Sequence, residues 1–260
     1  SLVKEPKYRT GFDRNFWIWE EYDPTCNYLM VADVARGDGE DFSTFHIIEL
    51  ETLSAIAEYQ GKPNPDMFAS MLNQTGREFG GCMLVVENNN IGYTVLDKLI
   101  EYQYPNLYYS VKSTHEYINQ HQAEVINSSV AGFSTSMKTR PLIIAKMEEF
   151  IRNKLIKIYS SRTINEMRTF IWKNGKPQAM RSYHDDLIMA LAIACWVRDT
   201  ALQTNARDLN YQKAFAQSII ISKTSFNTKI KGQVGYKNDN IFDKMKEAEN
   251  LYNQYKWIIK

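Results

Sequence analysis

The feature that most constrains this chain is the apolar run 187–197, which directly follows two adjacent acids, Asp185 and Asp186. Because the run is apolar all the way round, it predicts a helix buried in a core. The run is too short to span a bilayer, and the chain does not open with a signal peptide. We therefore expect a soluble globular protein with no membrane partner.

Two carboxylates at the start of a buried helix have two interpretations. Asp185 or Asp186 could cap the helix, where a carboxylate accepts unpaired N–H groups and suits the positive end of the dipole. The alternative is a functional site, which two other segments favour. Residues 28–33 and 83–87 are short hydrophobic runs typical of buried strands, and they end in Asp33 and Glu87. Three separate elements therefore carry an acid at one end.

The connections around these acids predict an α/β fold. A glycine-bearing turn follows Asp33 and leads to a second strand, so a hairpin brings Asp41 back near Asp33. The strand ending at Glu87 is followed by a polar loop and an amphipathic helix at 93–100. Ligands of α/β sheets collect beyond the carboxyl ends of the strands, where Glu87 would lie. No G-x-x-x-x-G-K-[ST] motif occurs anywhere, which excludes a P-loop.

The charges are unevenly placed, although the net charge is only +1. Residues 20–66 hold 11 acids against 2 bases, whereas residues 138–181 hold 11 bases against 3 acids. An acidic cluster beside a basic surface fits a metal site fed by a phosphate-binding groove, with chance imbalance of solvated faces as the alternative. The candidates for contacts with the phosphates of a nucleic-acid backbone in such a groove are Lys138, Arg140, Lys173, Lys176 and Arg181.

Length and spacing suggest the organisation of the chain. With 260 residues and 44% hydrophobic content, a sizeable core is expected. We expect a linker and edge strand over 1–24, a globular α/β domain over 25–200, and an extension with an amphipathic helix over 201–260. The three cysteines lack metal-ligand spacing, so we expect free thiols and no zinc.

Bringing Asp33, Glu87 and Asp186 together would create an oxygen-only ligand set. Hard divalent ions such as Mg²⁺ prefer such ligands together with substrate phosphates, and a pair of ions can clamp an in-line phosphoryl displacement. Neighbouring helix residues point about 100° apart, so only one of Asp185 and Asp186 can face the site squarely. Asp186 is the first choice.

Three segments carry a family resemblance: residues 31–43 (VADVARGDGEDFS), 85–89 (VVENN) and 183–192 (YHDDLIMALA). Together they resemble the nuclease domain of the large terminase subunit of tailed bacteriophages, particularly the T-even-like group. Residues 132–141 and 164–170 resemble intervening segments of the same family. The resemblance covers roughly residues 25–200, and it is far more specific than any single acid.

The resemblance implies a ribonuclease H-like fold, with a mixed central sheet flanked by helices. It implies an endonuclease that cuts concatemeric double-stranded DNA into genome lengths. Asp33, Glu87 and Asp186 match the family's ligands for Mg²⁺ or Mn²⁺, with Asp41 and Asp185 as auxiliary acids. The implied partners are DNA, the N-terminal ATPase domain of the full-length subunit, the portal protein and the small terminase subunit. The implied location is the cytoplasm of the infected bacterium.

One departure from the family pattern shapes the expectation. The full-length subunit also has an ATPase domain, whereas this sequence has no P-loop, so we expect an isolated C-terminal nuclease domain without ATP hydrolysis. Two alternatives stay open. One is a DNA-gripping module of a packaging motor that does not cut, and the other is a nuclease resembling Holliday-junction resolvases.

Overall fold

The computed structural model describes residues 3–89, 91–111 and 129–198. The expected extension over 201–260 and residues 112–128 lie outside the described residues. The strands are β1 (Tyr8–Thr10), β2 (Phe16–Ile18), β3 (Tyr28–Asp33), β4 (Ser43–Glu49), β5 (Ser54–Gly61), β6 (Met83–Val86), β7 (Tyr109–Val111), β8 (Ser129–Ala131), β9 (Lys157–Ile158), β10 (Phe170–Lys173) and β11 (Lys176–Ala179). The helices are α1 (Pro65–Glu78), α2 (Gly92–Glu101), α3 (Thr139–Arg152), α4 (Ser161–Thr169) and a helix over residues 186–198.

The central sheet is mixed, as expected for the fold class. Its strands follow the order β1-β2-β5-β4-β3-β6, and β9 pairs with β5. β3, β4 and β5 form an antiparallel meander, whereas β6 runs parallel to β3. The expected strand near residue 16 is β2, but β1 pairs with its outer side, so β2 lies inside the sheet.

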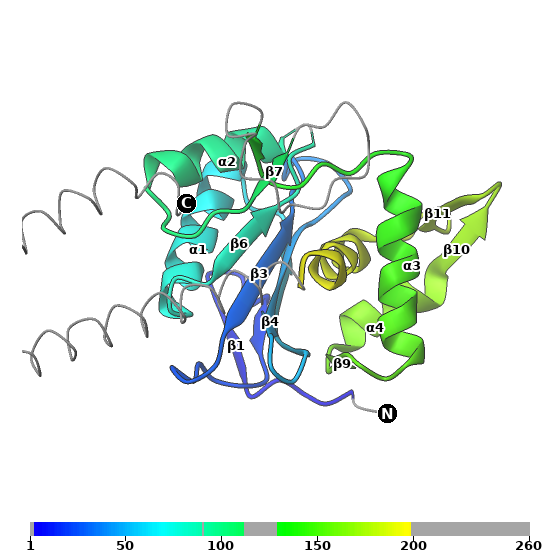
Figure 1. Ribbon diagram of the computed structural model, residues 1–260, viewed down its shortest axis with the longest axis horizontal. Helices are drawn as coiled ribbons and strands as arrows, with labels where there is room; N and C mark the ends of the chain where they lie inside the picture. Colours follow the sequence, from blue (N-terminus) through cyan, green and yellow to red (C-terminus); the bar gives the residue numbers. More distant parts are fainter. Residues whose placement is uncertain (1–2, 90, 112–128, 199–260) are drawn as a thin grey trace, which may run out of the picture. The chain divides into compact units, whose positions relative to one another are not determined.

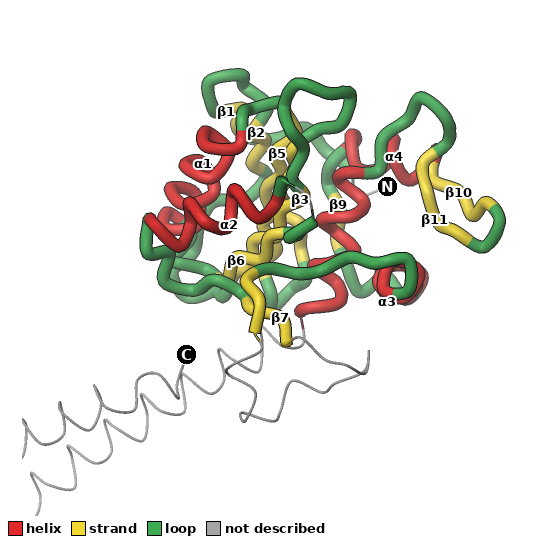
Figure 2. The backbone as a smooth tube through the Cα atoms, turned by 90° about the horizontal axis from the view of Figure 1, so that it is seen from above, coloured by secondary structure: helices red, strands yellow, loops and turns green. Residues whose placement is uncertain are grey.

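Helices cover both faces of this sheet (Figure 1). Met30 and Ala32 of β3 pack in a core cluster with residues of α1 and α2, whereas Leu29 and Val31 pack in a second cluster with residues of α3 and helix 186–198. Figure 2 shows the two groups of helices on opposite sides of the strands. The continuous apolar sequence of β3 follows from this arrangement, because a strand buried on both faces has no polar side.

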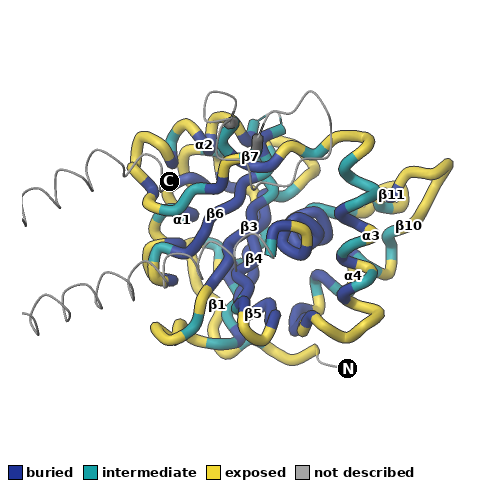
Figure 3. The backbone as a smooth tube through the Cα atoms, in the orientation of Figure 1, coloured by how far each residue is buried: buried dark blue, intermediate teal, exposed yellow. Residues whose placement is uncertain are grey.

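Helix 186–198 is enclosed by the second core cluster (Figure 3). Every residue from Leu187 to Cys195 is buried, and only Trp196 in the run reaches solvent to a large extent, at 43% exposure. The prediction of a helix that is buried all round is therefore confirmed. None of the helices among the described residues is both long and apolar enough to cross a membrane.

The expected hairpin after α4 is also present. β10 and β11 pair around Asn174 and Gly175, whose φ angles of 52° and 73° are both positive. Asparagine and glycine tolerate that conformation, which matches the twist of a two-residue hairpin turn. The hairpin continues directly from α4. Residues 180–185 connect β11 to helix 186–198.

Candidate metal centre

The parallel pairing of β3 and β6 places two acids side by side. Ala32 pairs with Val86, and the N–H of Glu87 donates to the carbonyl of Ala32 at 2.9 Å, so Asp33 and Glu87 occupy the next position of the register. Side chains alternate along a strand, and Val31 and Val85 point into the core that contains helix 186–198. Asp33 and Glu87 therefore lie on that same face, at the carboxyl ends of neighbouring strands.

Helix 186–198 supplies the third acid. The carboxylate of Asp186 accepts a hydrogen bond from the N–H of Phe42 at 3.0 Å, and its backbone carbonyl accepts one from Thr44 Oγ1 at 3.1 Å. Thr44 is the register partner of Asp33. The start of β4 thus fixes the first helical residue next to the acidic ends of β3 and β6.

The surroundings of the cluster raise the pKa of two of its acids, Asp33 and Asp186. Burial, followed by the charge and hydrogen bonding of Glu87 and the charges of Asp186 and Asp185, raises the pKa of Asp33 well above its usual range. Burial raises the pKa of Asp186 to about 6; the Phe42 N–H opposes this rise, and Asp41 adds to it. Crowded carboxylates disfavour their own charges until a cation joins them. The site is thus chemically suited to a hard divalent ion.

An asparagine orients the glutamate of this cluster. Asn89 Nδ2 donates to Glu87 Oε1 at 2.9 Å and to the carbonyl of Thr135 at 2.8 Å. The bond leaves the second oxygen of Glu87 for another partner. The sequence argument did not select Asn89, although its place two residues after a strand-end acid is a usable signal, because such amides commonly bond locally in turns.

Asp41 and His184 lie at the solvent side of Asp186. His184 Nδ1 is 3.8 Å from both Asp41 Oδ1 and Asp186 Oδ2, and the His184 ring packs edge-on against Phe42. One ligand atom from each of Asp41, His184 and Asp186 lies within 4.8 Å of the others. Asp41 thus lies near the cluster, as expected, and the acid of the cluster that it approaches is Asp186. His184 was not among the sequence candidates, although it directly precedes the two acids.

Asp185 faces a different set of groups from Asp186. Its Oδ2 accepts a hydrogen bond from the N–H of Ala179 at 3.0 Å and pairs with the guanidinium of Arg140. Arg140 Nε also donates to the carbonyl of Pro177 at 3.1 Å. Asp185 and Arg140 therefore attach hairpin β10–β11 to the start of α3. Arg140, a candidate DNA contact from sequence, is already engaged by these internal partners.

The other basic candidates lie at the surface. Lys138 precedes α3, Lys173 and Lys176 flank the hairpin turn, and Arg181 follows β11; all four are exposed. A shallow groove runs between α3 and β11. Its lining residues are Met137, Arg140, Pro141, Lys176, Pro177 and Gln178.

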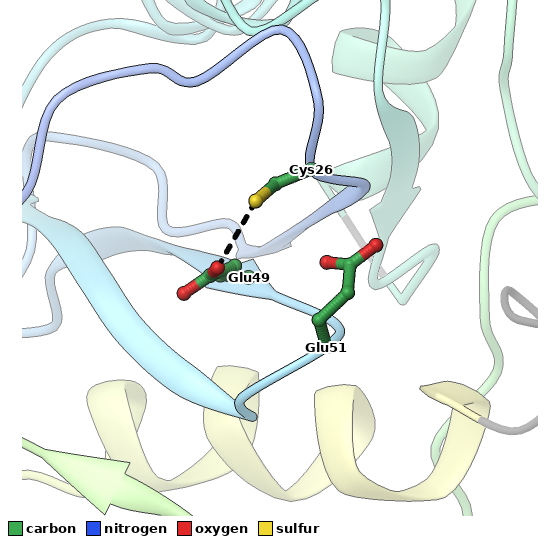
Figure 4. A group of neighbouring side chains, drawn as sticks. All are labelled: Cys26, Glu49 and Glu51. Atoms are coloured by element: carbon green, nitrogen blue, oxygen red, sulfur yellow. Dashed lines mark hydrogen bonds between the residues drawn. The ribbon is translucent and has the colours of Figure 1, made fainter.

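A second cluster of potential ligands lies at the other end of β3 and β4. Figure 4 shows Cys26, Glu49 and Glu51, whose ligand atoms lie within 4.8 Å of one another. The Cys26 thiol donates to Glu49 Oε1 at 3.2 Å, and this bond raises the pKa of the thiol. Glu51 accepts hydrogen bonds from the backbone and side chain of Asn27. The cluster's groups therefore already have hydrogen-bond partners, and the thiol is protonated. Both features disfavour metal binding.

Comparison with known proteins relates this architecture to solved nucleases. The sequence matches no family model. The large terminase nuclease from thermophilic phage G20c is 17% identical and has a TM-score of 0.56, with 74% of this chain and 92% of that chain covered. The same nuclease with bound magnesium gives the same identity and TM-score over 75% and 92%. The large terminase nuclease domain of Thermus phage P74-26 is 16% identical, with a TM-score of 0.53 over 74% and 89%. This chain therefore has the ribonuclease H-like fold of the large terminase nucleases.

Proposed function

We propose that this chain is the metal-dependent endonuclease domain of a viral DNA-packaging terminase, of the T-even-like group. The observation that carries the proposal is the convergence of Asp33, Glu87 and Asp186 from two parallel strands and one buried helix. The similarity of the fold to large terminase nucleases supports the same reading. Its substrate would be concatemeric double-stranded DNA, cut into genome lengths in the cytoplasm of the infected bacterium.

The donor set fits a divalent cation. Asp33 is partly buried and crowded by other acids, and among the described residues it forms no ion pair with a lysine or arginine. The G20c nuclease has been solved with magnesium, cobalt and zinc. Oxygen ligands favour Mg²⁺ or Mn²⁺ for this chain, and we propose two ions held by Asp33, Glu87 and Asp186.

The residues of the chain would divide the work of phosphodiester hydrolysis. When bound, divalent ions lower the pKa of water and stabilise the charge of the attacking and leaving oxygens. Asp33 and Asp186 would bind as carboxylates, and Asn89 would hold Glu87 in its ligating orientation. The products would be a 3′-hydroxyl and a 5′-phosphate.

DNA would approach along the basic side of the molecule. Lys138, Lys173, Lys176 and Arg181 are exposed and would contact backbone phosphates without reading sequence. Arg140 would act on DNA indirectly, because its guanidinium fixes the hairpin that carries two of these lysines. The proposed protein partners are the ATPase domain of the full-length subunit, the portal protein and the small terminase subunit.

Plasmid cleavage with Mg²⁺ or Mn²⁺ tests the proposal. The unaltered chain should cut, whereas Asp33→Asn, Glu87→Gln and Asp186→Asn should each lower the rate by at least about a thousandfold, because each removes a metal ligand. Glu51→Gln, in the cluster of Figure 4, is the matched control and should cut normally. Folding of each variant is checked by circular dichroism. DNA binding without cleavage in both metals would contradict the nuclease assignment and favour a gripping module.

A further inference from the structure

The N-terminal turn of helix 186–198 is capped by a residue from another helix. Glu166 of α4 is buried, and its Oε2 accepts hydrogen bonds from the N–H groups of Leu187 at 3.0 Å and Ile188 at 3.2 Å. Such N–H groups have no partner within their own helix, and they are usually satisfied by the side chain of the residue that starts it. Here the acceptor lies 21 residues earlier in the chain.

The helix has two acids of its own that would normally cap it. Asp185 occupies the cap position, since its carbonyl accepts the first helical bond, from the N–H of Met189. Its side chain is instead engaged by Arg140 and Ala179. Asp186 bonds to the N–H of Phe42 and faces Asp33 rather than its own helix. Of the two interpretations that the sequence left open, side-chain capping by Asp185 or Asp186 is therefore not the one observed, because Glu166 accepts the hydrogen bonds of those N–H groups.

Glu166 is itself held in place. Gln60 of β5 donates to Glu166 Oε1 at 2.9 Å, so both oxygens of the carboxylate are used. His46 of β4 contacts the carbonyl of Leu187 through Nε2 at 3.0 Å. The first turn of the helix is thus fixed to the sheet by three elements. Because these contacts fix the position of the helix, they also fix where the Asp186 carboxylate lies relative to Asp33.

We propose that Glu166 is a positioning residue of the metal centre: by capping helix 186–198 in place of the helix's own acids, it leaves the Asp186 carboxylate free to bind the metal. The inference rests on the proposed function of Asp186 as a ligand. Without Glu166, the unpaired N–H groups would need another acceptor, and Asp186, the first residue of the helix, carries a carboxylate that no lysine or arginine among the described residues engages. Capping and metal binding would then compete for the same oxygens.

The test measures Mn²⁺ affinity by calorimetry on the full chain, together with kcat, KM and Tm. Glu166→Ala should weaken Mn²⁺ binding about tenfold and lower kcat, as is typical when a residue that orients a ligand is lost, while KM for DNA stays unchanged. Glu166→Gln keeps an amide oxygen as acceptor and should restore most of the affinity. Gln60→Ala, which only loosens Glu166, should have a smaller effect in the same direction.

A matched control separates positioning from simple loss of a cap. Asn64 caps α1 on the opposite face of the sheet, where its side chain accepts the N–H of Met67 at 2.8 Å. Asn64→Ala should lower Tm but leave Mn²⁺ affinity unchanged. If Glu166→Ala lowers Tm and binds Mn²⁺ as tightly as the parent, the inference is overturned. If Glu166→Ala does not fold, Gln60→Ala decides: weaker Mn²⁺ binding in this variant supports the proposal, and unchanged binding overturns it. A parent chain that binds no Mn²⁺ refutes the proposed function itself.

Discussion

A buried acid and a partly buried acid lie on the same sheet, Glu58 and Asp33, and their surroundings are opposite. Glu58 of β5 is 1% exposed and is paired with Arg162, and it also accepts hydrogen bonds from the hydroxyls of Ser160 and Thr163. Asp33 of β3 is surrounded instead by other acids, which raise its pKa. A buried charge that is fully paired holds a structure together, whereas a buried group of like charges is stable only with an added cation. The contrast separates a structural acid, Glu58, from the proposed metal ligand Asp33.

The largest effect on stability should come from replacing each of these two acids in turn. Glu58→Ala leaves the guanidinium of Arg162 buried without its partner, which should lower the free energy of unfolding by about 3–5 kcal/mol. Asp33→Asn removes a repelling charge, so it should leave the unfolding free energy of the metal-free chain equal or higher. Urea denaturation measures both. A marked loss of stability in Asp33→Asn would break the comparison.

A pH series should sharpen the comparison through metal binding. The pKa of Asp186 is about 6 in the folded chain, against about 4 for an unfolded aspartate. Between these values the unfolded chain releases the proton while the folded chain retains it, so the stability that Asp186 contributes without metal falls as pH rises. Mn²⁺ requires the carboxylate, so its affinity should rise with pH up to about 6 and then level off.

Asp186→Asn is the reference variant for the pH series, because it lacks the carboxyl group that titrates. The difference in unfolding free energy between the parent and this variant should decrease from pH 4 to pH 6 without metal. A difference that stays constant across this range would mean that Asp186 does not titrate as the buried member of an acid cluster.

The smallest effects should come from exposed charges at the tip of the β10–β11 hairpin. Lys173→Gln and Lys176→Gln should each weaken DNA binding a few-fold and reduce the slope of log affinity against log salt by about one. Fluorescence anisotropy at several salt concentrations measures both quantities. Lys98→Gln on α2, whose side chain bonds to Glu101, serves as control and should change neither. An unchanged salt slope in both hairpin variants would remove them from the DNA contact surface.

The sequence predicted the parts of this site that depend on local pattern. The strands ending at Asp33 and Glu87, the Asn174-Gly175 turn and the buried helix all follow from periodicity and turn chemistry. β5 was not predicted, because its sequence SAIAEYQG is rich in residues that are depleted in strands. Its buried Glu58 is tolerated only through Arg162, a partner about a hundred residues away in sequence.

The unpredicted parts of the site depend on contacts distant in sequence. Nothing near Glu166 in the sequence indicates that its carboxylate reaches Leu187 and Ile188, because that contact requires α4 to pack against the sheet. The roles of Asp185 and Asp186 were likewise separable only after folding, since they depend on Arg140 and Phe42. The sequence pattern identifies the candidate acids, whereas the tertiary contacts of the folded chain determine the surroundings of each one.

The contact between Phe42 and Asp186 closes a loop of 144 residues. Closing a loop of this length costs conformational entropy, which more local contacts such as the β3–β4 hairpin do not incur to the same degree. The meander of β3, β4 and β5 can therefore form early. Asp186 comes close to Asp33 only after residues 186–188 have folded onto the sheet. A partly synthesised or partly folded chain lacks the third acid. The proposed metal site is thus complete only in the fully folded domain.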